Sequence, residues 1–385
     1  MSSFVQKKWA DICTLEYGKG IRDYKNEDND YFVYGSAGRV GTHSEFHLDK
    51  GVIVSRKGTL DVHYSDKPFF VIDTAFFLKP KPELNAKWAY YALKNFDIKK
   101  LTSGSGVPSL SRDEFYAEDL FLPSLEYQNK VESILSNIDK KIELNQKMNE
   151  TLEEIAKTLF KSWFIDFGPV RAKAEGRPTG LSKEISDLFP DSFEDSELGK
   201  IPKGWKVSKL ESIIDVLGGH AFKSKDYVDN GIFVLRTKNF NEGIAEPLRD
   251  DVFLPNSFLD SHQDFICEEY DYHLVMVGAS IGKTGMIFPS MMPALRNQNM
   301  WCFRPREAKY SKIFTKFVVD TVTKKLLGFA SGSARDFFKK GDFRSHKLVI
   351  PSETILESFR SITDTLLIKK SKNIEETKLI TNLRD

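Results

Sequence analysis

The stretch NKVESILSNIDKKIELNQKMNETLEEIAKTLF, residues 129–160, decides how this chain folds. It holds no glycine or proline, and neither does the wider interval 125–166. Apolar and amide side chains recur in it at alternating steps of four and three residues, the heptad spacing of a helix that packs against another helix. This seam consists of Val131, Leu135, Ile138, Ile142, Asn145, Asn149, Leu152, Ala156 and Leu159. A helix of about forty residues is roughly 60 Å long.

The same plan recurs near the end of the chain. The two stretches SGSGVPS (103–109) and SGSARDF (331–337) share their opening, and the register that aligns them continues without a gap for some forty residues. It places Phe115 on Phe343, Leu120 on Leu348, Pro123 on Pro351 and Asn145 on Asn373. Repetition of this length predicts two units built alike. Residues 353–385 accordingly predict a second, weaker helical seam, on which Leu366, Asn373 and Ile380 lie.

A mixed segment precedes each helix. Short apolar runs such as GVIVSRKG (51–58) and HLVMVGAS (273–280) are typical of strands joined by turns. We therefore predict an α+β fold with two similar globular α/β domains, separated by two long antiparallel helices that form a coiled coil in a pseudo-two-fold arrangement. The alternative is that each helix packs on its own domain as an ordinary core helix. The expected segments are 1–124 (first domain), 125–166 (first helix), 167–200 (connector), 201–352 (second domain) and 353–385 (second helix).

The composition bounds the class of protein. A length of 385 residues, with 41% of them apolar and 29% charged, predicts a soluble globular protein of two or three domains. No apolar run reaches the roughly 18 residues that a membrane span needs. The three cysteines show no CxxC spacing, which favours a cytoplasmic location and predicts neither a disulfide framework nor a metal site.

The net charge of +1 hides an imbalance between the two halves. Residues 200–350 hold 23 Lys and Arg against 17 Asp and Glu, whereas residues 1–120 hold 17 of each kind. An excess of cations indicates a polyanion as partner for the later half, and charge alone indicates nothing for the first.

The segment GASIGKTG (278–285) resembles a phosphate-binding loop. That motif needs four residues between its glycines and a helix after it, but only three residues separate Gly278 from Gly282, and MIFPSMMP (286–293) is typical of strand and turn. Two interpretations remain: a nucleotide-binding enzyme that uses Gly278 to Thr284, or a turn that contacts a nucleic-acid phosphate. We find no other catalytic set in the sequence.

Glycine-rich loops carry side chains suited to reading base edges, since Arg pairs with guanine and Asn or Gln with adenine. A solvated turn is the alternative for any single residue, so the prediction applies to the loops as a set. The candidates in the first unit are Arg39, Thr42, His43, Ser44, Arg56 and Lys57. The candidates in the second are His220, Lys223, Arg236, Lys238, Asn239, Ser280, Lys283, Thr284, Arg296, Asn297 and Gln298.

At this point a family resemblance is plain. The run 144–205 resembles the central region of specificity (S) subunits of type I restriction–modification systems, and GSGVPSLSRDEF (104–115) resembles the entry to that region. RTKNF (236–240) and GASIGKTG match a looser pattern of target recognition domains. One departure is Asp61, where Gly282 stands in the second unit and the family usually has glycine.

The resemblance implies a non-catalytic DNA-recognition subunit. Each domain would read one half of a split target on double-stranded DNA, and the helices would set the spacer. Two modification subunits would bind S-adenosylmethionine, and restriction subunits would use ATP and magnesium, so this chain itself would need no cofactor. A purely structural coiled-coil scaffold is a further alternative. The residues expected to pair the helices are Leu135, Ile138, Ile142, Asn145, Leu152, Leu366, Asn373 and Ile380.

Overall fold

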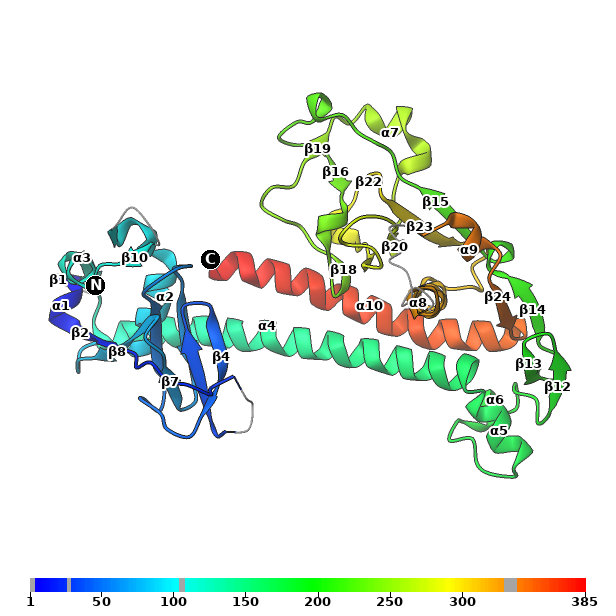
Figure 1. The fold of residues 1–385 in the computed structure, drawn as a ribbon, viewed down its shortest axis with the longest axis horizontal. Coiled ribbons are helices and arrows are strands. Elements are labelled where there is room, and N and C mark those ends of the chain that lie inside the picture. Colours follow the sequence, from blue (N-terminus) through cyan, green and yellow to red (C-terminus); the bar gives the residue numbers. More distant parts are fainter. Residues whose placement is uncertain (1–3, 26–28, 104–107, 329–337) are drawn as a thin grey trace. The chain divides into compact units, whose positions relative to one another are not determined.

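The computed structural model describes residues 4–25, 29–103, 108–328 and 338–385. The chain forms two compact units, one of residues 1–143 with 379–385 and one of residues 144–378. The two long helices, α4 (Leu125–Phe160) and α10 (Glu353–Arg384), each contribute to both units (Figure 1). Most of both Ser-Gly-Ser stretches lies outside the described residues. None of the described helices is long and apolar enough to cross a membrane.

The first unit contains two main sheets. One has four strands in the order β2-β8-β5-β6, and the other has three in the order β4-β3-β7. Two short pairs, β1-β11 and β9-β10, accompany them. The elements are β1 (Val5–Lys8), α1 (Trp9–Ile12), β2 (Cys13–Tyr17), β3 (Tyr31–Gly35), β4 (Gly38–His43), β5 (Gly51–Ser55), β6 (Val62–Ser65), β7 (Phe69–Val71), β8 (Ala75–Pro80), α2 (Ala86–Asn95), η1 (Ile98–Leu101), β9 (Thr102–Ser103), β10 (Ser109–Leu110), α3 (Arg112–Ala117) and β11 (Asp119–Leu122).

The second unit repeats this layout with longer loops. Its main sheet has six strands in the order β15-β23-β20-β21-β18-β17, and its smaller sheet has three in the order β19-β16-β22. The elements are η2 (Lys161–Ile165), α5 (Gly168–Ala174), α6 (Lys183–Ser186), β12 (Phe193–Ser196), β13 (Gly199–Pro202), β14 (Lys206–Lys209), η3 (Leu210–Ser212), β15 (Ile214–Gly218), η4 (Ser224–Asp226), β16 (Ile232–Leu235), η5 (Thr237–Asn239), β17 (Phe240–Asn241), β18 (Gly243–Ala245), β19 (Phe253–Leu254), α7 (Phe258–Ser261), η6 (Gln263–Phe265), β20 (Tyr272–Val275), β21 (Thr284–Met286), η7 (Pro289–Met291), β22 (Ala294–Arg296), β23 (Met300–Pro305), α8 (Lys312–Gly328), α9 (Lys340–Arg344) and β24 (Lys347–Ile350).

The core strand connections of the two units correspond, and the second unit adds β18 and β17 to its main sheet. The order β2-β8-β5-β6 matches β15-β23-β20-β21, and in both smaller sheets a central strand has one parallel and one antiparallel neighbour. A strand pair also closes each repeat, β1 with β11 in the first unit and, after the β12-β13 pair, β14 with β24 in the second. The internal repeat predicted from the sequence is therefore a repeat of topology.

The core of the first unit packs around an aromatic pair and helix α2. The rings of Trp9 and Phe115 lie 5.3 Å apart, and both side chains are buried. The side chain of Asn85 caps α2 by accepting from the N–H groups of Lys87 and Trp88, which orients the apolar face of the helix toward the four-stranded sheet. Capping and burial thus act together to hold α2 on the sheet.

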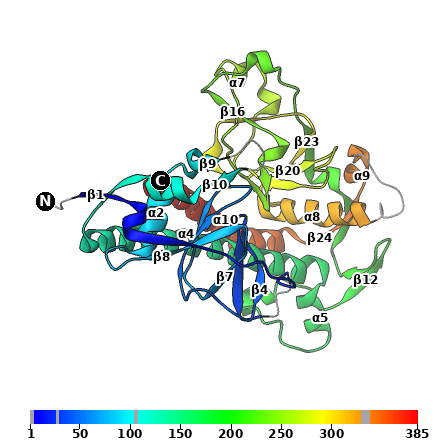
Figure 2. The ribbon, with the colours of Figure 1, turned by 60° about the vertical axis from the view of Figure 1, so that its left-hand side comes forward.

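An aromatic cluster holds together the core of the second unit. Phe160 from α4, Phe314 from α8 and Phe359 from α10 pack within 6.3 Å of one another, measured between ring centroids. Helix α8 accordingly lies between the six-stranded sheet and the two long helices of this unit (Figure 2). Helix α4 continues as the π-helical turn Lys161–Ile165 and ends where Phe167 adopts a left-handed φ of 54° before Gly168 and Pro169.

Within the second unit the long helices run antiparallel. The Asn145 side chain donates to Glu376 (2.9 Å), and Asn373 donates to Asn149 (2.9 Å). The residue numbers of the bonded partners decrease along α10 as they increase along α4. This confirms the predicted antiparallel pair and excludes helices that pack only on their own domain. Asn145 and Asn373 are buried at 0% and 1% exposure, and the other residues expected to pair the helices are half-buried: Leu135, Ile138, Ile142, Leu152, Leu366 and Ile380.

Candidate nucleic-acid interface

In the first unit, the ends of β2, β3, β5 and β7 meet at one edge. The backbone N–H of Ile72 donates to Tyr34 (2.9 Å), which joins the segment after β7 to β3. The N–H of Arg56 donates to Thr74 (2.9 Å), which joins the β5–β6 loop to the same segment. Loops that are far apart in sequence thereby form one continuous surface.

The second unit brings the corresponding strand ends together in the same way. The N–H of Asn297 donates to Leu235 (3.0 Å), and that of Met276 donates to Asn299 (3.1 Å). His220 forms a parallel bridge with Asn297. The loops 218–223, 236–240, 276–283 and 297–299 therefore share one edge, which we call the reading edge of the second unit.

A glycine in each unit permits this close approach. A Cβ on Gly18 would lie 2.1 Å from the carbonyl oxygen of Ile72, and a Cβ on Gly219 would lie 1.8 Å from that of Asn297. Both distances are far below van der Waals contact. Any other residue at these two equivalent positions would push the loops apart.

The candidates of the first unit divide into two groups. Arg56 and Lys57 lie on the β5–β6 loop at the edge. Arg39 is exposed on β4, and its guanidinium lies 3.8 Å from the ring centroid of Phe32. His43 pairs with the opposite end of β3 and Ser44 follows it, so the structure does not bring these two to the edge.

Sequence reasoning missed Tyr17 at the first edge. This half-exposed ring lies 4.9 Å from the guanidinium carbon of Arg56 and 4.9 Å from that of Arg112. Such an Arg–Tyr–Arg stack presents both cations together. An exposed aromatic at the end of a strand was the available signal, but nothing local in the sequence links it to Arg112.

Most candidates of the second unit lie along its reading edge. Lys223, Lys238, Lys283 and Gln298 are exposed, whereas His220, Arg236, Ser280, Thr284 and Asn297 are half-buried. Two of these cations already have acidic partners, since Lys238 forms an ion pair with Asp250 and Arg236 lies 3.5 Å from Asp251. The exposed cations Lys223 and Lys283 are thus the better candidates for phosphate contacts.

For three candidates the structure assigns a different role from the one predicted. Thr42, Asn239 and Arg296 are buried, so their side chains do not reach a ligand surface. Asn239 donates to Asp251 (2.8 Å) and to the Glu246 carbonyl (3.0 Å), which folds the 236–251 loop on itself. Residue type alone predicted a base contact, but burial makes these residues supports of the loops.

The GASIGKTG segment forms the hairpin between β20 and β21. Its last two residues already belong to the strand Thr284–Met286, so the helix that a nucleotide-binding loop requires is replaced by β structure. Gly278 and Gly282 supply positive φ angles of 83° and 85°. In the first unit's hairpin Gly58 does so (φ 81°), while Asp61 accepts hydrogen bonds from Val62 and Lys94, both at 2.7 Å.

The repeat also agrees with a comparison against known families. A family model described as the type I restriction modification DNA specificity domain matches residues 1–154 and 202–377. The chain belongs to the type I restriction–modification DNA specificity family. The two matched intervals fall on the two structural repeats, and neither the structure nor the comparison supports the nucleotide-binding alternative.

Curated relatives and a solved structure place the specificity family in context. The MjaIX specificity subunit of Methanocaldococcus jannaschii is 26% identical over 313 residues, which cover 80% of this chain and 68% of the relative. The HindI specificity subunit of Haemophilus influenzae is 24% identical over 322 residues, covering 72% and 69%. The S subunit crystal structure from M. genitalium superposes with a TM-score of 0.63 at 16% identity, covering 100% and 94% of the two chains, so the two share a fold.

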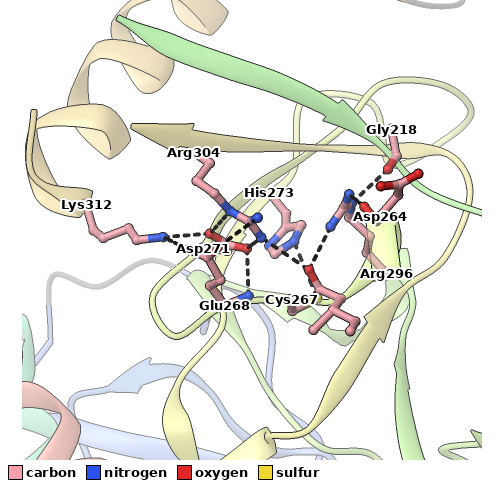
Figure 3. A network of polar contacts seen from close by, with 10 residues as sticks. Gly218, Asp264, Cys267, Glu268, Asp271, His273, Arg296, Arg304 and Lys312 are labelled. Carbon is pink, nitrogen blue, oxygen red and sulfur yellow. Dashed lines mark hydrogen bonds and ion pairs between the residues drawn. The ribbon is translucent and has the colours of Figure 1, made fainter. Parts of the chain in front are cut away.

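A buried polar network lies beside the reading edge of this specificity protein's second unit (Figure 3). Asp271 accepts from Arg304 (2.5 Å) and Lys312 (2.7 Å). Burial alone would raise the pKa of Asp271, but the hydrogen bond from Arg304 and the charge of Lys312 outweigh it and hold that pKa well below its usual range. Asp271 is therefore an ionised carboxylate that anchors two cations.

Asp271, His273 and Cys302 place one potential metal-ligating atom each within 4.8 Å of one another. Burial lowers the pKa of His273 to about 4 and raises the pKa of the Cys302 thiol well above its usual value. A protonated thiol and a carboxylate already neutralised by two cations form a poor donor set. The chemistry of this cluster favours a structural role.

Proposed function

We propose that this chain is the DNA-reading subunit of a type I restriction–modification complex, and that each unit reads one half of a split, asymmetric target. The observation that carries the proposal is the shared topology, which brings loops of different sequence to the equivalent edge of both units. Equal scaffolds with unequal loops suit two different half-sites. The recognition domains we propose are residues 1–124 and 201–352, and the chemistry of modification would belong to partner subunits.

Two kinds of contact support the reading edges in this role. Exposed Lys57, Lys223 and Lys283 suit phosphate oxygens, which position a protein on DNA without reading its sequence. Arg56 and Gln298 carry the bidentate groups that distinguish guanine and adenine in the major groove. Phosphate contacts would set the affinity for DNA, and base contacts would set the sequence preference.

The paired helices support two further parts of the proposal. As a helix pair of fixed register, they would hold the half-sites about one helical turn (roughly 34–36 Å) apart. They also expose large apolar side chains in the second unit, namely Leu144 and Ile155 on α4 and Ile368 on α10. We propose that two modification subunits cover such surfaces, and that these subunits bind S-adenosylmethionine and flip out the target adenine. Restriction subunits that use ATP and magnesium would join the same assembly.

A domain exchange tests the division of labour. Residues 201–350 are replaced by the corresponding domain of another family member, and methylated adenines are mapped by sequencing native DNA from cells that express the complex. We expect one half-site to change and the other to stay. The reciprocal exchange of residues 1–124 serves as the matched control and should change only the other half-site. A change in both half-sites from one exchange would refute modular reading.

A heptad insertion tests the helices as a spacer. Seven residues added to α4 after Glu143, and seven added to α10 after Lys378, keep the seams in register. The pair lengthens by about 10 Å at 1.5 Å per residue, or about three base pairs at 3.4 Å each. We expect a correspondingly longer target spacer or loss of assembly, and insertion into α4 alone serves as a mismatched control. A methylated target with its original spacing would contradict the proposal.

Salt dependence tests the phosphate contacts. The affinity of the assembled complex for its target should fall with salt at a log–log slope near −0.9 for each phosphate contact. Exchanging Lys283 for Met should reduce the magnitude of this slope by about one such contact. A slope that is flat in the parent complex would contradict DNA binding through these loops.

A further inference from the structure

Arg296 is the largest buried cation beside the second reading edge. Its side chain is 1% exposed, and its guanidinium donates to three backbone carbonyls (Figure 3). Nε donates to Gly218 (2.7 Å), Nη1 donates to Ile266 (3.0 Å), and Nη2 donates to Asp264. A rigid, planar fork of this kind fixes both the distance and the angle between the groups that it bonds.

The three carbonyls belong to segments that shape the reading edge. Gly218 ends β15 and begins the loop with His220 and Lys223. Asp264 and Ile266 lie in the segment that follows α7, whose rings contact that loop, since the rings of His220 and Phe265 lie 4.9 Å apart. The backbone of Arg296 contributes as well, because its carbonyl accepts from the N–H of His220 (3.2 Å).

The fork is itself anchored to the core of the domain. The Ile266 carbonyl also accepts from Arg304 (3.2 Å), which binds the ionised Asp271. Asp271 accepts in addition from Lys312 at the start of α8. A continuous set of partly buried hydrogen bonds therefore runs from the loops, through Arg296 and Arg304, to the helix that packs on the long helices.

The first unit has no such fork at the equivalent strand position. In the parallel pairs, Arg296 stands opposite Leu235 and the corresponding Val71 stands opposite Tyr34. Val71 has an aliphatic side chain in an apolar cluster. The arginine is thus a property of the second domain alone, which gives its test an internal reference.

We propose that Arg296 is a positioning residue that sets the base preference of the second half-site without touching DNA. It does so by holding the 218–223 and 262–266 backbones in one arrangement, so that the side chains of the first of these loops meet the bases in one geometry. This inference rests on the proposed function. Loss of the Arg296 guanidinium would relax the base preference at the second half-site and leave that at the first unchanged.

The test uses the full chain assembled with its modification subunits. Complexes carrying Arg296→Met or Arg296→Lys methylate a DNA library with both half-sites randomised, and the methylated molecules are sequenced. We expect discrimination at the second half-site to fall about tenfold or more with Met, within the range of one specific base contact. The point-charge donor of Lys should give a smaller loss. Discrimination at the first half-site should be that of the parent.

Three controls separate positioning from loss of stability. Val319→Ala truncates a fully buried side chain on α8 of the same domain, in an apolar cluster that includes neither Phe265 nor Ile266, and Arg249→Met removes an exposed arginine and should match the parent. Parent-like discrimination in both Arg296 variants would overturn the inference, and so would an equal relaxation in Val319→Ala. The double variant Gln298→Ala with Lys223→Ala separates failure of the proposed function from failure of the positioning role. If this double variant leaves both half-sites unchanged, the proposed function fails. If it changes a half-site while both Arg296 variants match the parent, only the positioning role fails.

Discussion

A buried lysine joins three helices in the second unit, and its removal gives the sharpest stability prediction. Lys316 on α8 is 7% exposed and donates to Glu153 on α4 (2.7 Å) and Asp320 (3.0 Å). Glu153 also accepts from Lys370 on α10 (3.0 Å). The change is Lys316→Met, which keeps the length of the aliphatic chain and removes the charge.

The magnitude follows from what remains unpaired. Breaking a buried ion pair by removing one partner costs about 3–5 kcal/mol, because the other charge stays buried. Glu153 keeps Lys370, and Asp320 keeps the hydroxyl of Tyr272, which donates to it. We therefore expect the low end, about 3 kcal/mol. For a unit of this size that lowers the midpoint of thermal unfolding by roughly 6–12 °C.

Urea and thermal unfolding followed by circular dichroism measure the effect. Lys130→Met on the same helix α4 is the control, since Lys130 and its partner Glu126 are 70% and 79% exposed, and we expect no measurable change there. The double variant Lys316→Met with Glu153→Gln should be less destabilised than the sum of the two single variants. If Lys316→Met unfolds like the Lys130 variant, the packing of α8 on α4 and α10 does not depend on this ion network.

Three further outcomes can be checked in the same way. The pKa of His273 in the fold, about 4, lies below its ordinary value of 6.5, so the neutral ring contributes stability that is complete above about pH 6.5 and is lost as the pH falls toward 4. His273→Phe should remove this pH dependence, worth up to ~3 kcal/mol, from the free energy of unfolding. An unchanged profile of unfolding against pH would contradict a neutral, buried His273. Gly219→Ala should weaken DNA binding and stability, whereas Gly218→Ala, whose Cβ meets nothing within 4 Å, should not; equal behaviour of the two would contradict the close approach. Tyr91→Phe removes the hydroxyl that donates to Asp139 (2.6 Å) and should lower the free energy of unfolding by about 1.5–3 kcal/mol, and a loss no larger than that of the exposed Tyr127→Phe would argue against this bond.

The architecture follows from periodicity, which is a property of sequence alone. Phe115 and Phe343 were aligned by the repeat, and both are fully buried at equivalent positions. Asn145 and Asn373 were placed on the seams, and both bond across the helix pair. These features were predictable because each depends on residue spacing along one helix or one repeat.

The reading edges were predictable only as loops. Arg296 has the residue type that binds guanine, yet its partners are carbonyls up to 78 residues away, and no local pattern indicates that the side chain points inward. Tyr17 was missed for the same reason, since its second cation, Arg112, comes from a distant helix. Residue type predicts what a side chain can bind, while the fold decides whether it meets solvent or backbone.

In each unit, the segment from β1 to β11 or from β14 to β24 begins and ends at the same place. Because β14 lies beside β24, and β1 beside β11, everything between them is a closed excursion with a single two-stranded neck. A substitute of another length or base preference has to present a matching pair of strand ends and, in the second unit, a helix that packs on α4 and α10 as α8 does. Under the proposed division of labour, whole-domain replacement would change the target sequence and leave the long helices as they are.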